Sequence, residues 1–585
     1  MDRRAFRYLV PYWRRLVLVL VISLISTATT LIIPYLSKDL IDTALVGRDL
    51  DALRRIVAWF IGLGVLGFVL NVTSGLRYTR VSAEILFDMR LALYAHLQRL
   101  SPRFYARTRL GDIVSRLNND ISEIQRVAAE AALAWVGNVL FLAGSLAMMV
   151  WLDWRLAIVA LAPLPISLIA LAFYRRRLES RVAELRQRSA DIGSFLIETL
   201  QAASLVVASN AQAREQDRFR GLNGAFIEAL MRMQRVTYFA GGLPGTVLSV
   251  GSAIAFFYGG LRVIDGTLTL GTMGAFLAYQ MRVFAPAQAL MGLWASLATA
   301  KVSWLRVLEI LDAPIDVVER ADAQPIVDPK GELSFEGVTL GTDRSRVLDE
   351  VSFVAGPGQT VALVGGSGVG KSTIAYLAAR LLDPESGAVR LDGLDLRSLT
   401  LDSVRRHVVL VEQEPTLLHA TIEENIRYVR PSATSDDLRR AAEAAGIAAF
   451  VASLPEGYAT VVGERGLAVS AGERQRIALA RAFVADPAVL VMDEPTAALD
   501  AIAQRQVIAG SRAVMRGRTT LLITHRREVA MAADHVVVLD GARVVDAGAP
   551  LDLAERSTAF ARLFELDVSA GAPGARGDLP AGTVA

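Results

Sequence analysis

The chain has no cysteine, only five histidines among 585 residues, and a net charge of only +3. Without cysteine it cannot form disulfides, zinc–thiolate sites or a cysteine nucleophile. The near-balanced charge argues against nucleic acid as a partner. The histidines other than His525 have no paired spacing that indicates a metal site.

What the chain has in excess is apolar sequence. Hydrophobic residues make up 53% of it, and the mean hydropathy is +0.39. This is too apolar for an average soluble protein, and several runs approach the ~20 residues that cross a bilayer. Five of these runs carry no charge: Leu16–Leu36, Ile56–Leu76, Ala131–Leu152, Leu156–Phe173 and Tyr238–Leu261. A sixth, Gly266–Ala300, contains one charged residue, Arg282. We therefore predict a transmembrane domain of six helices over residues 1–313.

The gaps between these runs alternate in length. The gaps after the second and fourth runs, 77–130 and 174–237, are long, rich in helix formers and poor in Gly and Pro. Folded as two antiparallel helices of roughly 27 residues, such a gap reaches about 40 Å beyond the membrane. We predict that these gaps form long intracellular helices, with two intracellular coupling loops.

Positive charge indicates the side of the membrane. The two long gaps hold 9 and 11 arginines, whereas the three short gaps together hold six Lys or Arg. The positive-inside rule places the N-terminus and the long gaps in the cytoplasm. Six spans then return the chain to the cytoplasm.

A phosphate-binding loop follows the membrane half. A polar segment, 314–331, is interpreted as a linker, and the apolar strand Thr360–Val364 then leads into a G-x-x-x-x-G-K-[ST] sequence. Backbone N–H groups of such a loop, and the helix that follows, bind phosphate oxygens. Lys371 would reach the β- and γ-phosphates, and the Ser372 hydroxyl would bind Mg²⁺. The predicted loop residues are Gly365, Gly366, Ser367, Gly368, Val369, Gly370, Lys371, Ser372 and Thr373.

A second motif supports the first. The apolar residues Ala488–Met492 precede two carboxylates, Asp493 and Glu494, and Pro495 stops the strand. Asp493 is placed to hold Mg²⁺, and Glu494 to polarise the attacking water. The alternative, two surface acids at a strand end, fits the apolar run poorly. We predict an α/β P-loop nucleotide-binding domain over 332–567 that uses ATP and Mg²⁺, followed by a disordered Gly/Ala/Pro-rich tail, 568–585.

With these motifs in place, the chain resembles the ATP-binding cassette (ABC) exporters over nearly its whole length. The further matching segments are the signature-like Val469–Gln475, the D-loop-like Ala497–Asp500, the switch-like Thr524–His525, the Q-loop glutamine Gln413, the X-loop-like Val462–Gly466 and the first-intracellular-loop-like Gly111–Asp120. Their order and spacing make the resemblance specific. It implies a half-transporter of the type I exporter fold.

The resemblance also implies roles for individual residues. Glu494, His525 and Gln413 are expected to be catalytic, and Ser372, Gln413 and Asp493 to hold Mg²⁺. Two cassettes would enclose two ATP molecules, with the signature of one completing the site of the other. The ATP-site residues outside the phosphate loop would be Ser470, Ala471, Gly472, Glu473 and Asp500.

The activity implied is ATP-driven export of a hydrophobic or amphipathic drug, lipid or peptide across the cytoplasmic membrane, by alternating access. With one membrane half and one cassette, the chain must dimerise, and we favour a homodimer. Three alternatives stay open: an exporter-fold importer of a metal chelate, one half of a heterodimer, and a non-transporting regulatory membrane ATPase.

The sequence departs from the family pattern at four positions. Thr342 stands where the family usually has an aromatic residue that stacks on adenine, and threonine cannot stack. In the signature, Val469, Ala471 and Glu473 replace the usual Leu, Gly and Gln. Ala471 adds a methyl group where backbone approaches phosphate, and Glu473 adds a negative charge.

Polar residues interrupt the sixth apolar run at Tyr279, Gln280 and Arg282. A charge inside a membrane span is costly and is a functional-site candidate by default. Arg282 therefore either faces the cargo pathway or lies near the outer interface, where its side chain reaches the headgroups.

Overall fold

The computed structural model describes residues 3–342, 345–463, 469–496 and 501–564 of the chain. These residues form two compact units. The first comprises Met1–His96 and Leu110–Asp312, and the second comprises Leu97–Arg109 and Ala313–Ala585. The short segment Leu97–Arg109 thus belongs structurally to the second unit, although helices of the first unit flank it in sequence. The predicted tail, 568–585, lies outside the described residues.

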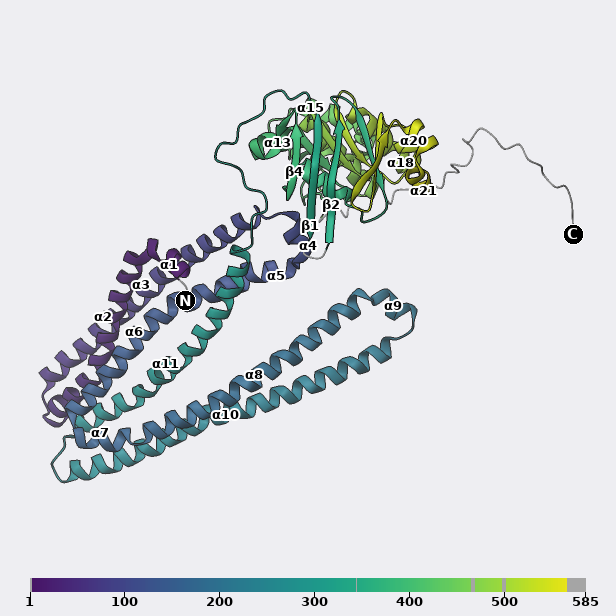
Figure 1. Ribbon diagram of the computed structural model, residues 1–585. Helices are drawn as coiled ribbons and strands as arrows, with labels where there is room; N and C mark the ends of the chain where they lie inside the picture. Colours follow the sequence, from purple (N-terminus) through teal and green to yellow (C-terminus); the bar gives the residue numbers. More distant parts are fainter. Residues whose placement is uncertain (1–2, 343–344, 464–468, 497–500, 565–585) are drawn as a thin grey trace, which may run out of the picture. The chain divides into compact units, whose positions relative to one another are not determined.

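The first unit is helical throughout. Its long helices are α2 (Trp13–Asp39), α3 (Leu50–Leu97), α6 (Ile121–Leu152), α8 (Pro163–Gln201), α10 (Gln212–Ile264) and α11 (Leu270–Leu311). The short ones are α1 (Arg3–Leu9), η1 (Val10–Tyr12), η2 (Leu40–Val46), α5 (Leu110–Ser115), η3 (Arg116–Asp120), α7 (Trp154–Leu161) and α9 (Ala203–Ala208). Helices α8 and α10 run side by side as a long antiparallel pair with α9 at its tip (Figure 1).

The predicted apolar runs lie on these helices. Within the described residues, five helical stretches are long and apolar enough to cross a membrane: Arg7–Val46, Leu50–Leu97, Trp135–Leu152, Trp154–Gln201 and Gln212–Ile264. The sixth run lies on α11, which is not among the five, and Gln280 and Arg282 interrupt its apolar sequence. Helices α3 and α10 contain 48 and 53 residues, far more than a span needs. The prediction of long helices that extend well beyond the apolar runs is confirmed.

The polar residues of α11 divide into two groups. Tyr279 and Gln280 are buried, and they donate hydrogen bonds to the backbone oxygens of Leu31 at 2.5 Å and Ala160 at 3.4 Å. Arg282 is exposed and lies 3.5 Å from the backbone oxygen of Thr30. Tyr279 and Gln280 therefore hold α11 against its neighbours, whereas the Arg282 side chain is exposed.

A polar ladder joins η3 to α11. Asp120 is buried, and its carboxylate accepts from the Ser303 hydroxyl at 2.9 Å and pairs with Arg306 at 3.2 Å. One turn away, Arg116 pairs with Glu309 at 2.9 Å. Because buried charges are costly unless paired, these contacts fix how the two helices pack at this end of the unit.

The second unit is built on two sheets. A four-stranded antiparallel sheet has the order β2 (Ser345–Ala355), β1 (Leu333–Thr342), β4 (Ser386–Leu391) and β5 (Leu394–Asp395). A six-stranded sheet has the order β10 (Arg543–Gly548), β9 (His535–Asp540), β3 (Thr360–Gly365), β8 (Thr519–Ile523), β7 (Val489–Asp493) and β6 (Val408–Val411). Its neighbouring strands are parallel except for β10, which is antiparallel to β9.

Helices cover these sheets and connect their strands. They are α12 (Lys371–Ala378), η4 (Leu396–Ser398), α13 (Leu401–His407), α14 (Ile422–Arg427), α15 (Ser435–Ala444), α16 (Ala448–Ser453), η5 (Gly457–Ala459), α17 (Ala471–Ala485), α18 (Ala501–Met515), α19 (Arg527–Ala530), α20 (Pro550–Arg556) and α21 (Thr558–Leu563). The short α4 (Pro102–Arg107) also belongs to this unit. The predicted P-loop α/β domain is confirmed.

Burial on both faces explains the continuous apolar strands. In β7, Val489 and Val491 join one hydrophobic cluster, while Leu490 and Met492 join another. Successive side chains of a strand point to opposite faces. A parallel sheet packed on both faces therefore selects an apolar residue at every position.

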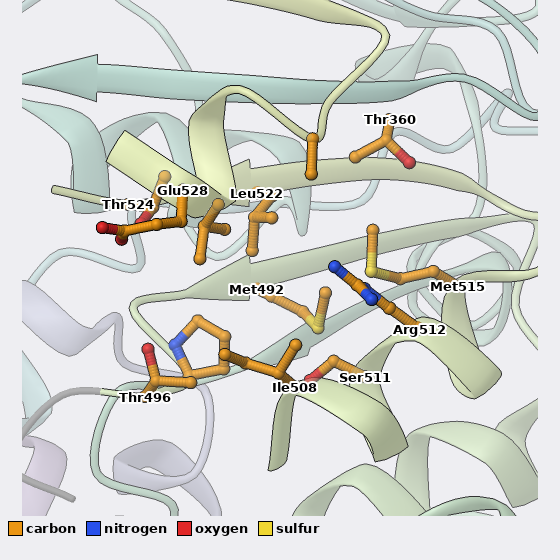
Figure 2. A pocket seen from close by; sticks show the side chains of 13 residues that line it. Thr360, Met492, Thr496, Ile508, Ser511, Arg512, Met515, Leu522, Thr524 and Glu528 are labelled. Atoms are coloured by element: carbon orange, nitrogen blue, oxygen red, sulfur yellow. The ribbon is translucent and has the colours of Figure 1, made fainter. Parts of the chain in front are cut away.

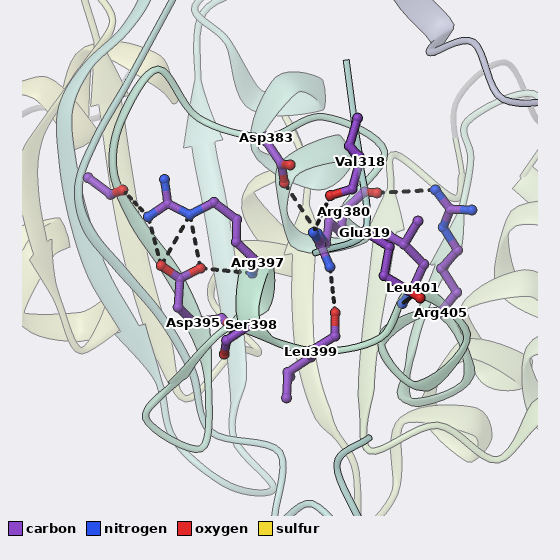
Figure 3. A network of polar contacts seen from close by, with 11 residues as sticks. Val318, Glu319, Arg380, Asp383, Asp395, Arg397, Ser398, Leu399, Leu401 and Arg405 are labelled. Atoms are coloured by element: carbon purple, nitrogen blue, oxygen red, sulfur yellow. Dashed lines mark hydrogen bonds and ion pairs between the residues drawn. The ribbon is translucent and has the colours of Figure 1, made fainter. Parts of the chain in front are cut away.

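The segment interpreted as a linker is hydrogen-bonded to the second unit (Figure 3). The buried Arg380 donates to the backbone oxygens of Leu399 at 2.7 Å and Val318 at 3.3 Å. The Glu319 carboxylate accepts from the Leu401 backbone N–H at 2.6 Å. These contacts hold the segment 314–331 against the rest of the second unit, to which it belongs.

Two side chains hold the segment Leu97–Arg109 on the same unit. The Ser101 hydroxyl donates to the Asp316 carboxylate. The Arg103 guanidinium, on α4, donates to the Gly341 backbone oxygen at 2.9 Å. This segment therefore contacts both the chain that follows α11 and the end of β1.

Candidate nucleotide site

Four neighbouring parallel strands bring the sequence motifs together. The phosphate loop follows β3, His525 follows β8, Asp493 ends β7, and Gln413 follows β6. The carboxyl ends of parallel strands meet at one edge of a sheet, which is where ligands bind in such folds. A cavity of about 480 Å³ lies there, lined by Val347, Gly365, Ser367, Gly368, Gly370, Lys371, Ser372, Thr373, Gln413, Asp493, Glu494 and His525.

Glycine is required at Gly370 in the loop. Its φ is +103°, in the region that side chains disfavour. A Cβ atom there would also lie 2.8 Å from the backbone oxygen of Val347 and 2.7 Å from the side chain of Leu348. The loop can therefore pass this close to β2 only without a side chain.

Lys371 begins α12, and its side chain folds back over the loop. Its ammonium donates to the backbone oxygens of Gly365 at 2.9 Å and Gly366 at 2.7 Å. Burial lowers the pKa of Lys371, although the negative charges of Glu494 and Asp493 oppose this shift. A phosphate group would stabilise the charged ammonium in the same way.

The carboxylate that ends β7 is also partly buried. Burial and the neighbouring Glu494 raise the pKa of Asp493, while a hydrogen bond from the Ser372 hydroxyl and the charge of Lys371 lower it, and the net direction is upward. Burial raises the pKa of Glu412 as well, with a further contribution from Asp493. Several acids thus share a confined space, a pattern that is typical of functional sites.

Glu494 has a strained backbone. Its φ is +43°, which costs energy for a residue with a side chain. Its N–H donates to the Ile523 backbone oxygen at 3.0 Å, so β8 supports this conformation. Its carboxylate lies 3.0 Å from Nδ1 of His525. The structure therefore brings into contact two of the three residues that sequence reasoning assigned to catalysis.

The signature-like segment forms the start of α17. The Ser470 hydroxyl accepts from the Glu473 N–H at 3.3 Å, and the Glu473 carboxylate accepts from the Ser470 N–H at 2.7 Å. This is a capping box, which satisfies two backbone donors at a helix start. Glu473, which departs from the family pattern, thus caps the N-terminus of α17. The sequence analysis did not predict this role.

Some predicted site residues do not meet in this cavity. Its described lining includes none of Ser470, Ala471, Gly472 and Glu473. Asp500 lies outside the described residues, as does most of the X-loop-like segment, 464–466. The lining does include Val347, which the sequence reasoning missed because no motif marks it.

A second cavity, of about 130 Å³, lies between β7, β8, α18 and α19 (Figure 2). Its lining includes Met492, Ile508, Met515 and Leu522. Its described lining contains none of the predicted phosphate-loop residues. The polar cavity at the strand ends is therefore the candidate nucleotide site.

Two protein-family models match the chain. Residues 16–287 match the ABC transporter transmembrane region, and residues 348–497 match the ABC transporter model. An ATP-dependent lipid A-core flippase of Thiobacillus denitrificans is 31% identical, over 97% of this chain and 98% of its own. This chain belongs to the ABC transporter family.

Further similarities identify the type of transporter. A putative multidrug export ATP-binding/permease protein of Staphylococcus aureus is 30% identical, over 97% of this chain and 100% of its own. A bacterial Atm1-family ABC exporter, solved with ATP bound, aligns with a TM-score of 0.78 at 26% identity, over 95% of this chain and 99% of that one. The ABC protein is a fused exporter with a helical transmembrane region followed by an ATP-hydrolysing domain, and its half-transporter organisation indicates dimerisation.

Proposed function

We propose that this ABC protein exports a hydrophobic or amphipathic substrate across the cytoplasmic membrane as a homodimer, with ATP hydrolysis at the polar cavity of the second unit. The observation that carries the proposal is the Glu494–His525 contact of 3.0 Å in the cavity that Lys371 enters. Glu494 would accept a proton from the attacking water, and His525 would orient Glu494 and contact the γ-phosphate.

The proposed Mg²⁺ site uses oxygen atoms that already lie together. The Ser372 hydroxyl donates to the Asp493 carboxylate, and Gln413 lines the same cavity. Hydroxyl, carboxylate and amide oxygens are the ligands that Mg²⁺ prefers. When bound, Mg²⁺ would neutralise charge on the β- and γ-phosphates. The partly buried Asp493 supports this role because a cation would offset the cost of burying its negative charge.

Two observations support a second copy of the chain as the partner. The signature residues Ser470 and Gly472 are separate from the cavity that they are expected to complete. In addition, large apolar side chains near the tip of the α8–α10 pair are exposed: Leu200 by 72%, Leu205 by 67% and Val207 by 65%. Apolar surface of this kind at a helix tip is typical of an interaction site.

The membrane and the cargo follow from the first unit. The arginine-rich long helices support a cytoplasmic location for that end of the unit, and the apolar helices suit a cargo pathway for hydrophobic or amphipathic molecules. The relatives' names, a lipid A-core flippase and a putative multidrug exporter, are consistent with such a cargo. The exposed Arg282 is a candidate contact for a polar group on it.

The test is ATP turnover by the purified chain in lipid nanodiscs. Glu494→Gln should reduce turnover by at least about 100-fold, since a positioned general base contributes on this scale. Glu528→Gln is the matched control: this glutamate also follows β8, but its side chain is 81% exposed, and turnover should be unchanged. Equal turnover in Glu494→Gln and the unmodified chain would refute the assigned site.

The same preparation separates the alternatives. Folded protein that binds ATP but does not turn it over would indicate a missing partner chain and a heterodimer. Inside-out vesicles that accumulate labelled lipid or drug analogues only with ATP would support export, whereas loss of a preloaded metal chelate would support import. Turnover without Glu494-dependent cargo movement would favour a regulatory ATPase.

A further inference from the structure

The end of β1 lacks the aromatic side chain that the family resemblance leads one to expect. The segment Val338–Thr342 contains no ring, and Thr342 stands at the position that resembles the adenine-stacking residue. Stacking on an aromatic or guanidinium plane is a main source of affinity for a nucleobase. A nucleotide whose base has no such plane to stack on would therefore bind more weakly. Another group near this strand end would have to supply such a plane.

Arg103 lies at this strand end. Its Nη2 donates to the Gly341 backbone oxygen at 2.9 Å, one residue from Thr342, and consecutive Cα atoms are about 3.8 Å apart. The side chain is half-buried, and among the described residues no carboxylate pairs with it. One N–H group thus fixes the guanidinium in place, while its other N–H groups are not paired with an acid.

This strand end also borders the nucleotide cavity. In the hairpin, Gly341 pairs with Arg346 and Leu340 pairs with Leu348. Val347, between the two partners, lines the cavity that contains Lys371. The base is the end of a nucleotide remote from the γ-phosphate, so it extends away from Glu494. The β1–β2 hairpin is therefore in position to meet it.

We propose that Arg103 supplies the stacking surface for the nucleobase, in place of the missing aromatic residue. The proposal rests on the proposed function, because it assumes that ATP occupies the cavity. The guanidinium is planar and stacks on π-systems, and its bond to the Gly341 oxygen holds it one residue from Thr342. Base recognition then comes from Leu97–Arg109, the segment that joins α3 to α5. Nucleotide occupancy is sensed by that segment through direct contact.

The test measures nucleotide binding rather than turnover. Full-length Glu494→Gln protein in nanodiscs is titrated with ATP and with UTP, which has the same ribose triphosphate but a smaller base. We expect ATP to bind more tightly than UTP. Arg103→Ala should weaken ATP binding by about 3- to 30-fold, as for loss of a cation–π contact, and should remove most of the preference over UTP.

Two further variants separate stacking from simple anchoring. Arg103→Lys can still donate to the Gly341 oxygen but has no planar group, so it should behave like Arg103→Ala. Adding Thr342→Tyr to Arg103→Ala should restore ATP affinity and base preference. The matched control is Arg99→Ala, in the same segment, which lines a different cavity and should leave both quantities unchanged.

Several outcomes would overturn the proposal. They are an unchanged ATP affinity in Arg103→Ala, a normal Arg103→Lys, an equal loss for ATP and UTP, or no preference in the parent protein. If Arg103→Ala fails to fold, Arg103→Lys still decides the question. Because binding is read without hydrolysis, a chain that turns over no ATP would refute the proposed function yet leave this test intact.

Discussion

In the second unit, the β3 residues Val361–Val364 are fully buried, whereas in the first unit Leu76 and Phe257 each expose 69% of their surface. Both regions are apolar, but their surroundings differ. The sheet is covered by helices, which remove its side chains from water. Exposed apolar side chains on a long helix suit hydrocarbon instead. An apolar segment can therefore belong either to a buried core or to a surface that faces lipid.

Both units contain buried charged side chains that have partners within the chain. In the first, the buried Asp120 pairs with Arg306. In the second, the buried Arg380 lies 3.3 Å from Asp383 and binds backbone oxygens, while the buried Lys371 meets carbonyls in a cavity that can admit a phosphate. Asp120 and Arg380 have charged partners within the chain, whereas the hydrogen bonds of Lys371 go to neutral backbone oxygens.

The largest effect should come from shortening matched leucines in the two units. Leu363→Ala, in the fully buried β3, should destabilise the second unit by about 2–5 kcal/mol, because it leaves a cavity. Leu76→Ala, on an exposed face of α3, should change stability by less than about 0.5 kcal/mol. Thermal unfolding in nanodiscs measures both. A comparable loss for Leu76→Ala would show that the partner chain, and not lipid, covers it.

A smaller effect should follow removal of the buried acid in the first unit. Asp120→Ala leaves the Ser303 hydroxyl and Arg306 without this partner, which should cost about 1–3 kcal/mol. Asp51→Ala, at an exposed ion pair with Arg54, is the control and should be nearly neutral. Unfolding in nanodiscs compares the two. Equal stability of both variants would mean that the ladder between η3 and α11 contributes nothing.

The smallest effect concerns pH and an exposed helix cap of the second unit. Hydrogen bonds from the Thr434 backbone and hydroxyl, and then from Arg440, lower the pKa of Asp437 to about 2. A lowered carboxyl pKa stabilises the fold above its ordinary value of 3.8, and this contribution is lost as the pH falls towards 2. Asp437→Asn should therefore flatten the acid limb of the unfolding profile slightly. Asp436→Asn, in the same turn, serves as control, and identical profiles for the two variants would contradict the assignment.

Local patterns predicted most of the nucleotide cavity. The phosphate loop, the Asp493–Glu494 pair and Gln413 each depend on a short segment that follows one strand, and parallel strands bring such segments to one edge. The signature serine was also predicted, but the capping role of Glu473 was not. A glutamate three residues after a serine caps a helix only if the helix starts there, and the sequence alone left that start unassigned.

Other features depend on contacts between distant segments. The placement of Leu97–Arg109 with the second unit comes from Ser101 and Arg103 meeting residues more than 200 positions later. The left-handed backbone of Glu494 is held by Ile523 on the next strand. No local pattern encodes either feature.

The sequence by itself determined the membrane runs, the order of the motifs, the chemical groups of the nucleotide site and the family, because each rests on residue types at short spacing. Only the tertiary structure decided which charges are paired, how Glu494 reaches His525, and that Arg103 donates to the Gly341 oxygen at the end of β1. Those arrangements arise when burial brings together residues far apart in the chain, and their energy depends on distances that the sequence does not contain.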